Sequence, residues 1–450
     1  MNQQGERWSA EQVLALAPDA ASRRAGGRLG TAGPWSEAGC GTEGAVWGLC
    51  KGSGSSPYRT AVDLAGDSGP GYRCSCPSRK FPCKHALGLL LLWAEEDPAV
   101  APGEPPAWAA QWITGRRGRS EERRSAASGA GPGAADPEAA RRRAERRAAR
   151  VTAGAIELEQ RLADLLRGGL SEAERAGYGL WEETAARMVD AQAPGLAARV
   201  RELGAIPSSG PGWPVRLLEE CALLHLLDQG WLRREELPGD LAATVRSRVG
   251  LPGTADGPPL RDEWLVLARY DTADAKLTTR RVWLYGAASH RTALLLSYGA
   301  AGRAPELALP VGLALDAEVS AYPGAGQQRA ALGRQFASAV PSSVRPPGVP
   351  VPQAAARYGA ALRDDPWLES VPVTLERVVP ARDGDSWQLA DADTDAALPL
   401  TSVARARPGL WRLVALSGGA PVTVFGECGH RGFTPLTAWP EGAGEAVALC

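Results

Sequence analysis

The chain has 450 residues, which at typical domain sizes is enough for two or three domains. Apolar residues make up 44% and charged residues 22%, so a core can form, and 53 Gly with 36 Pro stay below the level typical of disordered chains. The formal net charge of −1 excludes a polycationic nucleic-acid coat and an acidic solvating protein. Only four of the 50 basic residues are Lys, an arginine bias typical of GC-rich bacterial genes, so we expect a bacterial protein.

The sequence shows neither the pattern of a signal peptide nor that of a membrane-spanning segment. The start, MNQQGERWSAEQVLALAPD, has no basic segment followed by an apolar stretch, which a signal peptide would need. The longest strongly apolar run, at residues 86–94, is far shorter than the roughly 20 residues that span a bilayer. We therefore expect a cytoplasmic protein without membrane contact. Because thiols stay reduced in that compartment, the eight cysteines indicate a metal site before disulfides.

The first predicted elements are two strands and a helix. Residues 58–64 and 71–76 alternate as two strands of a hairpin, and Pro77 ends the second strand. An apolar helix follows at residues 86–93. Four potential metal ligands fall within twelve residues of this segment, spaced C-x-C and then C-x-H. They are Cys74, Cys76, Cys83 and His85.

The spacing of these ligands suits a tetrahedral zinc site. Residues i and i+2 on a strand point to one face, so the thiols of Cys74 and Cys76 converge. Cys83 and His85 follow the loop and lie at the start of the predicted helix. Three thiolates and one imidazole form a closed structural set with no vacant position for water or substrate. We predict one structural Zn²⁺ and no metal catalysis, with metal binding supplying much of the folding energy of so small a unit.

This segment resembles the SWIM zinc finger, whose pattern is C-x-C, a variable gap and C-x-H. All four ligands occur in order, and residues 45–50 with the strand from Tyr58 are similar to the N-terminal part of bacterial SWIM-containing proteins. The resemblance covers about residues 1–95. It implies a zinc-dependent module that binds DNA or protein. SWIM modules accompany helicase-type ATPases, transposases and ubiquitin-pathway proteins, and bacterial relatives are encoded near MoxR-type ATPases, which implies an adaptor for an ATPase system.

The remaining chain divides into four predicted segments after a zinc module at residues 1–97. Residues 98–135 are rich in Arg, Ala, Gly and Pro and are predicted to be a linker. Residues 136–250 have helical periodicity, with Asp136 as the N-cap of the first helix. After Pro252 the period changes to two, so residues 255–340 and 353–450 are predicted to be mainly antiparallel β. The fold class is thus multidomain α+β, with a hairpin-and-helix zinc module, a helical middle and a β-rich C-terminal half.

Some predicted elements of the β-rich half are specific enough to be tested. The odd positions of residues 307–319 form one apolar face, which predicts a strand. Short helices are predicted at residues 327–337 and 354–362. Residues 410–416 and 422–427 are predicted to be strands joined by a Gly418-Gly419 hairpin turn.

Charge around the finger leaves two partner classes open. Residues 1–150 hold 21 basic residues against 16 acidic ones, and the finger itself carries four cations that could contact nucleic acid or an acidic partner: Arg73, Arg79, Lys80 and Lys84. The same cations favour thiolates, and so metal binding, at the neighbouring cysteines. The near-zero net charge gives DNA no large basic face, so a protein partner is favoured and a DNA-binding protein is the alternative. A further Arg run at residues 141–150 is interrupted by Glu145, as in an ordinary solvated helix face.

Enzymatic function is the third hypothesis, and no common catalytic motif in the sequence supports it. None of the four lysines follows a glycine, so a phosphate-cradling loop is excluded, and no G-x-S-x-G or H-E-x-x-H motif occurs. We expect no enzyme activity; an enzymatic site would need a cavity with convergent polar groups in the C-terminal half. Two further Cys–His pairs, Cys221 with His225 and Cys428 with His430, leave a second metal open, although packed thiols are favoured for both. Cys40 and Cys50 are expected in the core, and His290 has no assigned role.

Overall fold

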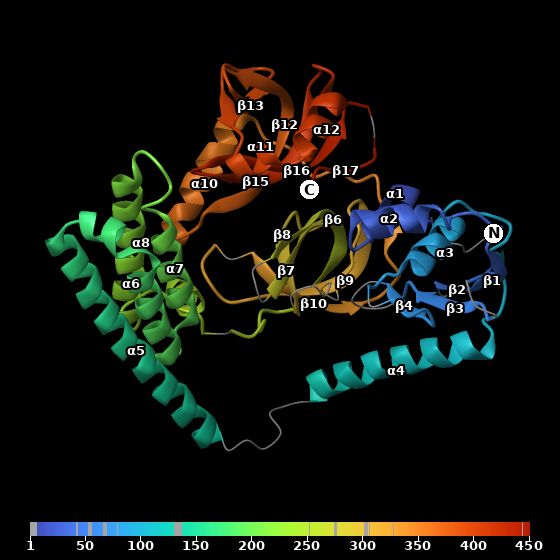
Figure 1. Cartoon of the computed structure of the whole chain (residues 1–450), viewed down its shortest axis with the longest axis horizontal. Coiled ribbons are helices and arrows are strands. Elements are labelled where there is room, and N and C mark those ends of the chain that lie inside the picture. The colour runs from blue at the N-terminus through green and yellow to red at the C-terminus, as the bar shows by residue number, and fades with distance from the viewer. Residues whose placement is uncertain are drawn as a thin grey trace.

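The computed structural model describes residues 7–41, 44–52, 56–65, 70–78, 80–129, 137–251, 253–273, 277–300, 305, 307–326, 328–442 and 444–450. Three sheets and one group of helices make up the molecule, in the order sheet, helices, sheet, sheet along the chain. The N-terminal sheet and the helical group lie at opposite ends, and the other two sheets lie between and above them (Figure 1). The predicted α+β class, with a helical middle and a β-rich C-terminal half, is confirmed.

The N-terminal unit is a five-stranded sheet of order β4-β3-β2-β1-β5, antiparallel except for the parallel β1–β5 pair. Its helix α3 carries a run of fully buried leucines, so α3 packs on one face of the sheet as the core of this unit. The elements are α1 (Ala10–Ala15), α2 (Ala20–Gly27), β1 (Trp35–Cys40), β2 (Ala45–Cys50), β3 (Tyr58–Asp63), β4 (Gly71–Cys74), α3 (Lys84–Ala94) and β5 (Ala101–Pro102).

The opposite face of this sheet is covered by a helix that sequence reasoning assigned to a linker. Helix α4 spans Ala107–Gly129, and its buried Ala109 and Ile113 pack on Trp47 and Ala61. The prediction of an unstructured linker over residues 98–135 is therefore wrong for Ala107–Gly129. Ala and Arg are strong helix formers, and one apolar turn at the start of α4 is enough to fix it on the sheet. Residues 130–136, including the predicted N-cap Asp136, lie outside the described residues.

The helical middle has its own core, formed by leucines and aromatic residues that recur at helical spacing. Helix α5 is long and its Arg-rich first half extends away from the rest of the molecule (Figure 1). The elements are α5 (Pro137–Gly168), α6 (Ser171–Asp190), α7 (Pro194–Ala205), α8 (Trp213–Leu232) and α9 (Gly239–Arg248).

The second sheet closes on itself, because strand β10 pairs with β8 on one side and with β9 on the other. Its strands are β6 (Leu260–Ala273), β7 (Leu277–Gly286), β8 (Thr292–Ala300), β9 (Leu313–Ala321), β10 (Arg329–Gln335) and β11 (Val340–Pro341). The helix predicted at residues 327–337 is wrong, because β10 supplies the pairing that closes this sheet. The strand predicted over 307–319 begins only at Leu313, since Pro310 and a positive φ at Gly312 interrupt the alternation before it.

The third sheet has the order β14-β13-β12-β15-β16-β17 and three helices beside it. The predicted strand at 410–416 is wrong: α12 places Leu410 and Leu413 in the core one helical turn apart. Gly418 is the left-handed C-cap of this helix rather than part of a hairpin turn. The elements are α10 (Val351–Asp364), β12 (Ser370–Asp383), β13 (Ser386–Asp391), β14 (Ala397–Pro399), α11 (Ser402–Ala406), α12 (Gly409–Ser417), β15 (Val422–Gly429), β16 (Gly432–Pro440) and β17 (Val447–Ala448).

These units share cores rather than standing apart. The core around α3 continues into the inner face of the second sheet as one cluster that contains both Leu87 and Trp264. The outer face of the second sheet packs on the third sheet through a smaller cluster that includes Trp283 and Phe425. The zinc-finger segment and the C-terminal half are therefore joined by continuous apolar packing.

Candidate metal centre

The four predicted ligands come from the end of a hairpin and the start of a helix. Thr60 on β3 lies opposite Cys74 on β4, and the backbone N–H of Ser75 still donates to the carbonyl of Arg59. Cys76 lies in the turn that follows β4. Strand pairing does not continue through Pro77, because proline has no backbone N–H to donate. Cys83 is the N-cap residue of α3, and His85 is in the first turn of that helix. The predicted strand thus ends two residues early, but the ligands still converge.

The geometry of the four side chains fits zinc. Their donor atoms all lie within 4.8 Å of one another, and the Cys74 Sγ and His85 Nδ1 atoms are 3.6 Å apart. With Zn–S near 2.3 Å and Zn–N near 2.0–2.1 Å, a tetrahedral centre places a sulfur and a nitrogen ligand about 3.5 Å apart. Cys83 and His85 are buried, and Cys74 and Cys76 are half-buried. These residues could hold Zn²⁺ without rearrangement of the backbone.

The surroundings of the ligands favour a thiolate at Cys74. Hydrogen bonding from Cys83 is the main effect that lowers the pKa of Cys74, to about 3, and His85 and Thr60 add to it. The Thr60 hydroxyl lies 3.3 Å from the Cys74 sulfur. The pKa of Cys83 is raised in turn, because its proton is shared with Cys74. When Zn²⁺ binds, the thiol protons are released and all three sulfurs coordinate the ion as thiolates.

The predicted basic rim of the finger is dispersed. Lys80 Nζ lies 2.6 Å from Asp19 Oδ2 on α2, so its charge is paired. Arg73 precedes Cys74 on β4 and pairs with Ala61, whose side chain faces α4, so Arg73 projects from the face opposite the thiol. Lys84 is exposed at the start of α3, and Arg79 lies outside the described residues. The described cations therefore do not form one surface.

The other cysteines and histidines lie apart from this centre. Elsewhere in the described ranges, no three Cys, His, Asp or Glu side chains gather closely enough to hold a metal. Cys221 is buried in the helical core, whereas His225 is exposed and bonded to Glu159. Cys428 is buried in the core of the third sheet, and Cys40 and Cys50 in that of the finger. His430 bonds to Tyr358, and His290 to Tyr285.

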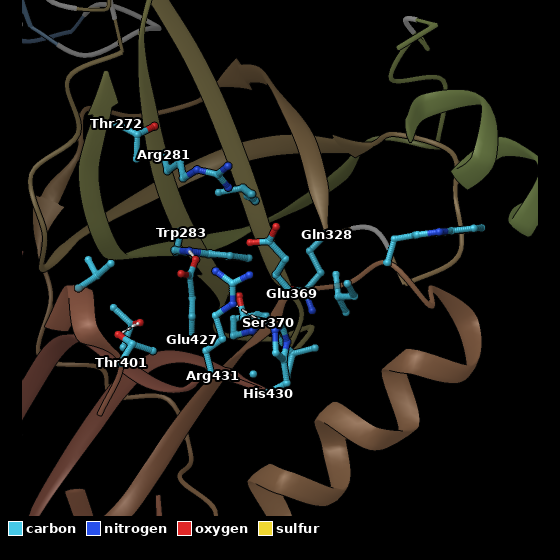
Figure 2. A pocket seen from close by; sticks show the side chains of 18 of the residues that line it. Thr272, Arg281, Trp283, Gln328, Glu369, Ser370, Thr401, Glu427, His430 and Arg431 are labelled. Carbon is cyan, nitrogen blue, oxygen red and sulfur yellow. Dashed lines mark hydrogen bonds between the residues drawn. The ribbon is translucent and has the colours of Figure 1, made fainter. Parts of the chain in front are cut away.

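A cavity of about 680 Å³ lies where the second and third sheets face one another beside α9. Figure 2 shows Arg281 and Trp283 on one sheet, with Glu427, His430 and Arg431 extending toward them from the other. Sequence reasoning did not identify this site, because its residues come from several separate segments between Ser247 and Thr434. One signal was present: Arg281 and Glu427 occupy the apolar phase of buried strands, in step with Trp283 and Phe425.

Comparisons with known families match two parts of the chain. Residues 58–94 match the SWIM zinc finger, and residues 146–249 match the SWIM-associated four-helix bundle domain. No curated protein and no solved structure matches the chain. No helix within the described ranges combines the length and hydropathy that crossing a bilayer requires. The chain therefore contains a SWIM zinc finger, whose matched segment includes all four ligands, and after it the helical bundle domain that is associated with this finger.

Proposed function

We propose that this protein is a non-enzymatic binding protein whose finger holds one structural zinc ion and presents a protein-interaction surface. Zinc binding itself rests on the four converging ligands. A structural role for the ion follows from its place: it would join the β3–β4 hairpin to α3, whose leucines are fully buried. A closed Cys₃His set leaves no coordination position for a substrate, so this ion takes no part in catalysis.

The exposure of Phe81 is the observation that most supports a protein partner. This residue lies in the loop between Cys76 and Cys83, and 44% of its surface is open to solvent. A large aromatic side chain on a metal-fixed loop is typical of a protein contact, because burying it stabilises the complex at little entropic cost. The described cations of the finger offer no continuous surface to a phosphate backbone, since Lys80 is paired with Asp19 and Arg73 of β4 lies on the opposite face.

The choice between protein and DNA can be tested with two single substitutions in the same loop region. We expect Phe81→Ala to abolish capture of partners from cells of the source organism by the immobilised full chain, and Lys84→Ala to leave capture unchanged. Labelled duplex DNA should show no saturable binding at about 50 mM salt, where phosphate contacts are strongest. Tight DNA binding that falls steeply toward 200 mM salt and weakens in Lys84→Ala would overturn the proposal in favour of a DNA-binding protein.

An adaptor for an ATPase system remains the form of this function that the SWIM resemblance implies. The partners retained by the unchanged chain and lost in Phe81→Ala should then include an ATPase. The enzymatic hypothesis has its required cavity in the C-terminal half (Figure 2). Among the described cavity residues, however, His430 bonds to Tyr358 and the Thr401 hydroxyl to Thr434, so neither forms a nucleophile–base pair with the other. We therefore assign binding, not catalysis, to this chain.

A further inference from the structure

The cavity between the second and third sheets is built from side chains that share one side of each sheet. Tyr270 on β6 lies opposite Arg281 on β7, and Trp283 follows on the same face two residues later. Glu427 projects from β15 toward them, in step with Phe425 of the apolar cluster that joins the sheets. The cavity is thus a continuation of a well-packed interface, with charged groups where the two sheets separate (Figure 2).

Two arginines of this cavity lack an acidic partner. Arg407, which caps the C-terminus of α11, has a buried Nη1 atom with no hydrogen-bond partner, and its Cζ lies 5.6 Å from the centre of the Tyr270 ring. Arg281 forms no ion pair or hydrogen bond with any residue in the described ranges. Both side chains line the cavity without a counter-charge among the described residues, so an anionic ligand would supply the acceptor that they lack.

Glu427 does not fill that role, because neutral donors hold it. Its Oε1 atom accepts from the Tyr270 hydroxyl at 2.8 Å and from Trp283 Nε1 at 3.0 Å. These two bonds fix the carboxylate against the aromatic wall rather than against a guanidinium group. Arg248 is paired with Asp365, and Arg431 lies 3.7 Å from Glu220, so both of these charges are balanced. The three other arginines on the wall, Arg281, Arg329 and Arg407, outnumber its two glutamates, Glu369 and Glu427, so the cavity is positive.

We propose that this cavity binds a small molecule that carries an oxyanion, a phosphate or a carboxylate group, between Arg281 and Arg407. Guanidinium groups recognise both anions through paired N–H donors, and the low-dielectric wall strengthens that contact. A hydroxyl or amine group of the same molecule would donate to Glu427, whose second oxygen has no partner among the described residues. The volume of about 680 Å³ is in the range of sites for metabolite-sized ligands. This site is separate from the zinc centre and does not depend on its proposed function.

Titration calorimetry on the full chain tests the proposal, with inorganic phosphate and citrate as the two probes at constant ionic strength. We expect saturable binding of at least one probe with a dissociation constant in the millimolar range, and the tighter probe identifies the anion class. Arg281→Gln and Arg407→Gln should each weaken binding at least tenfold, about 1.4 kcal/mol. Arg405→Gln is the matched control: Arg405 is exposed, two residues from Arg407 and outside the cavity, so binding should change less than twofold.

Two results would overturn the proposal. One is the absence of saturable binding of either probe up to about 50 mM in the unchanged chain. The other is an equal loss of affinity in Arg405→Gln and Arg407→Gln, which would show a diffuse charge effect rather than a site. Arg281 is on strand β7 of the second sheet and Arg407 follows helix α11, so a folding defect in one variant does not remove the test provided by the other.

Discussion

Cysteines of this chain differ in function because of what surrounds each sulfur. Cys74 has a hydroxyl, a second thiol and an imidazole within hydrogen-bonding distance, and these lower its pKa. Cys40 and Cys221 have apolar surroundings, and burial raises the pKa of each thiol. The C-x-C and C-x-H spacing picked out the three cysteines that converge with His85. Strand alternation places Arg73 on the face opposite Cys74, but spacing could not show that helix α4 covers that face.

Asp228 is a buried residue in the helical middle, and its effect on the free energy of unfolding should depend on pH. Its side chain is fully buried, neither carboxyl oxygen has a hydrogen-bond partner, and burial, followed by the charge of Glu159, raises its pKa to about 9. The unfolded chain releases this proton near pH 4. Between pH 4 and 9 the folded state therefore binds more protons than the unfolded state, and the free energy of unfolding falls as pH rises.

Asp228→Asn keeps the shape of the protonated side chain and removes its titration. We expect the variant to have a higher free energy of unfolding than the unchanged chain at pH 8 and a smaller advantage at pH 5. The difference in the free energy of unfolding should grow by up to about 1.4 kcal/mol per pH unit. The exposed Asp190→Asn is the control and should show no such growth. An equal advantage of Asp228→Asn at both pH values would mean that Asp228 does not titrate as described.

At the scale of elements, sequence periodicity identified most helices and strands, and its errors share a physical cause. Residues 329–335 form β10 and residues 409–417 form α12, although each short segment fits both periods. In such segments the partner decides: β10 completes the ring of the second sheet, and α12 packs one face on β16. Helix α4 was missed because its only apolar turn lies at its start. The cavity was missed because no local pattern connects Arg281 with Glu427.

The close packing of α3 on the segment after α2 leads to a prediction about a helical glycine, with a second glycine on α10 as the comparison. A Cβ atom at Gly88 on α3 would lie 2.6 Å from the Cβ of Leu29, whereas one at Gly359 on α10 would meet nothing within 4 Å. We expect Gly88→Ala to destabilise the chain by about 1–3 kcal/mol through overpacking. Gly359→Ala should stabilise it by about 0.5–1 kcal/mol through helix propensity. Chemical denaturation measures both, and a Gly88→Ala variant as stable as the unchanged chain would contradict this account of α3.

At the scale of the whole molecule, the finger is part of the framework of the protein. Its N-terminal helices bond to the second sheet and its flanks: Trp8 Nε1 donates to the carbonyl of Ala339 at 3.2 Å and Gln12 Nε2 to that of Val311 at 3.3 Å. The core around α3 also contains Trp264 and Leu313 of the second sheet. The helical middle has a separate core. Loss of zinc should therefore affect the second sheet more than the helices.

Hydrogen exchange before and after removal of zinc with a chelator tests this coupling. We expect the amides of α3, β6 and β9 to lose protection together, because one core stabilises them. The amides of α5 and α8 should keep their protection and are the internal reference. Loss of protection confined to residues 58–94 would mean that the finger folds independently of the second sheet.

The central claim is that Cys74, Cys76, Cys83 and His85 hold one zinc ion that the fold needs, and metal analysis of the purified, reduced chain tests it most directly. We predict about one zinc per chain, retained in Cys40→Ser, whose sulfur lies in the same core outside the ligand group, and lost with a fall in melting temperature in Cys83→Ser. Less than about half a zinc per chain after metal-replete purification, or unchanged zinc content and stability in Cys83→Ser, would contradict the account.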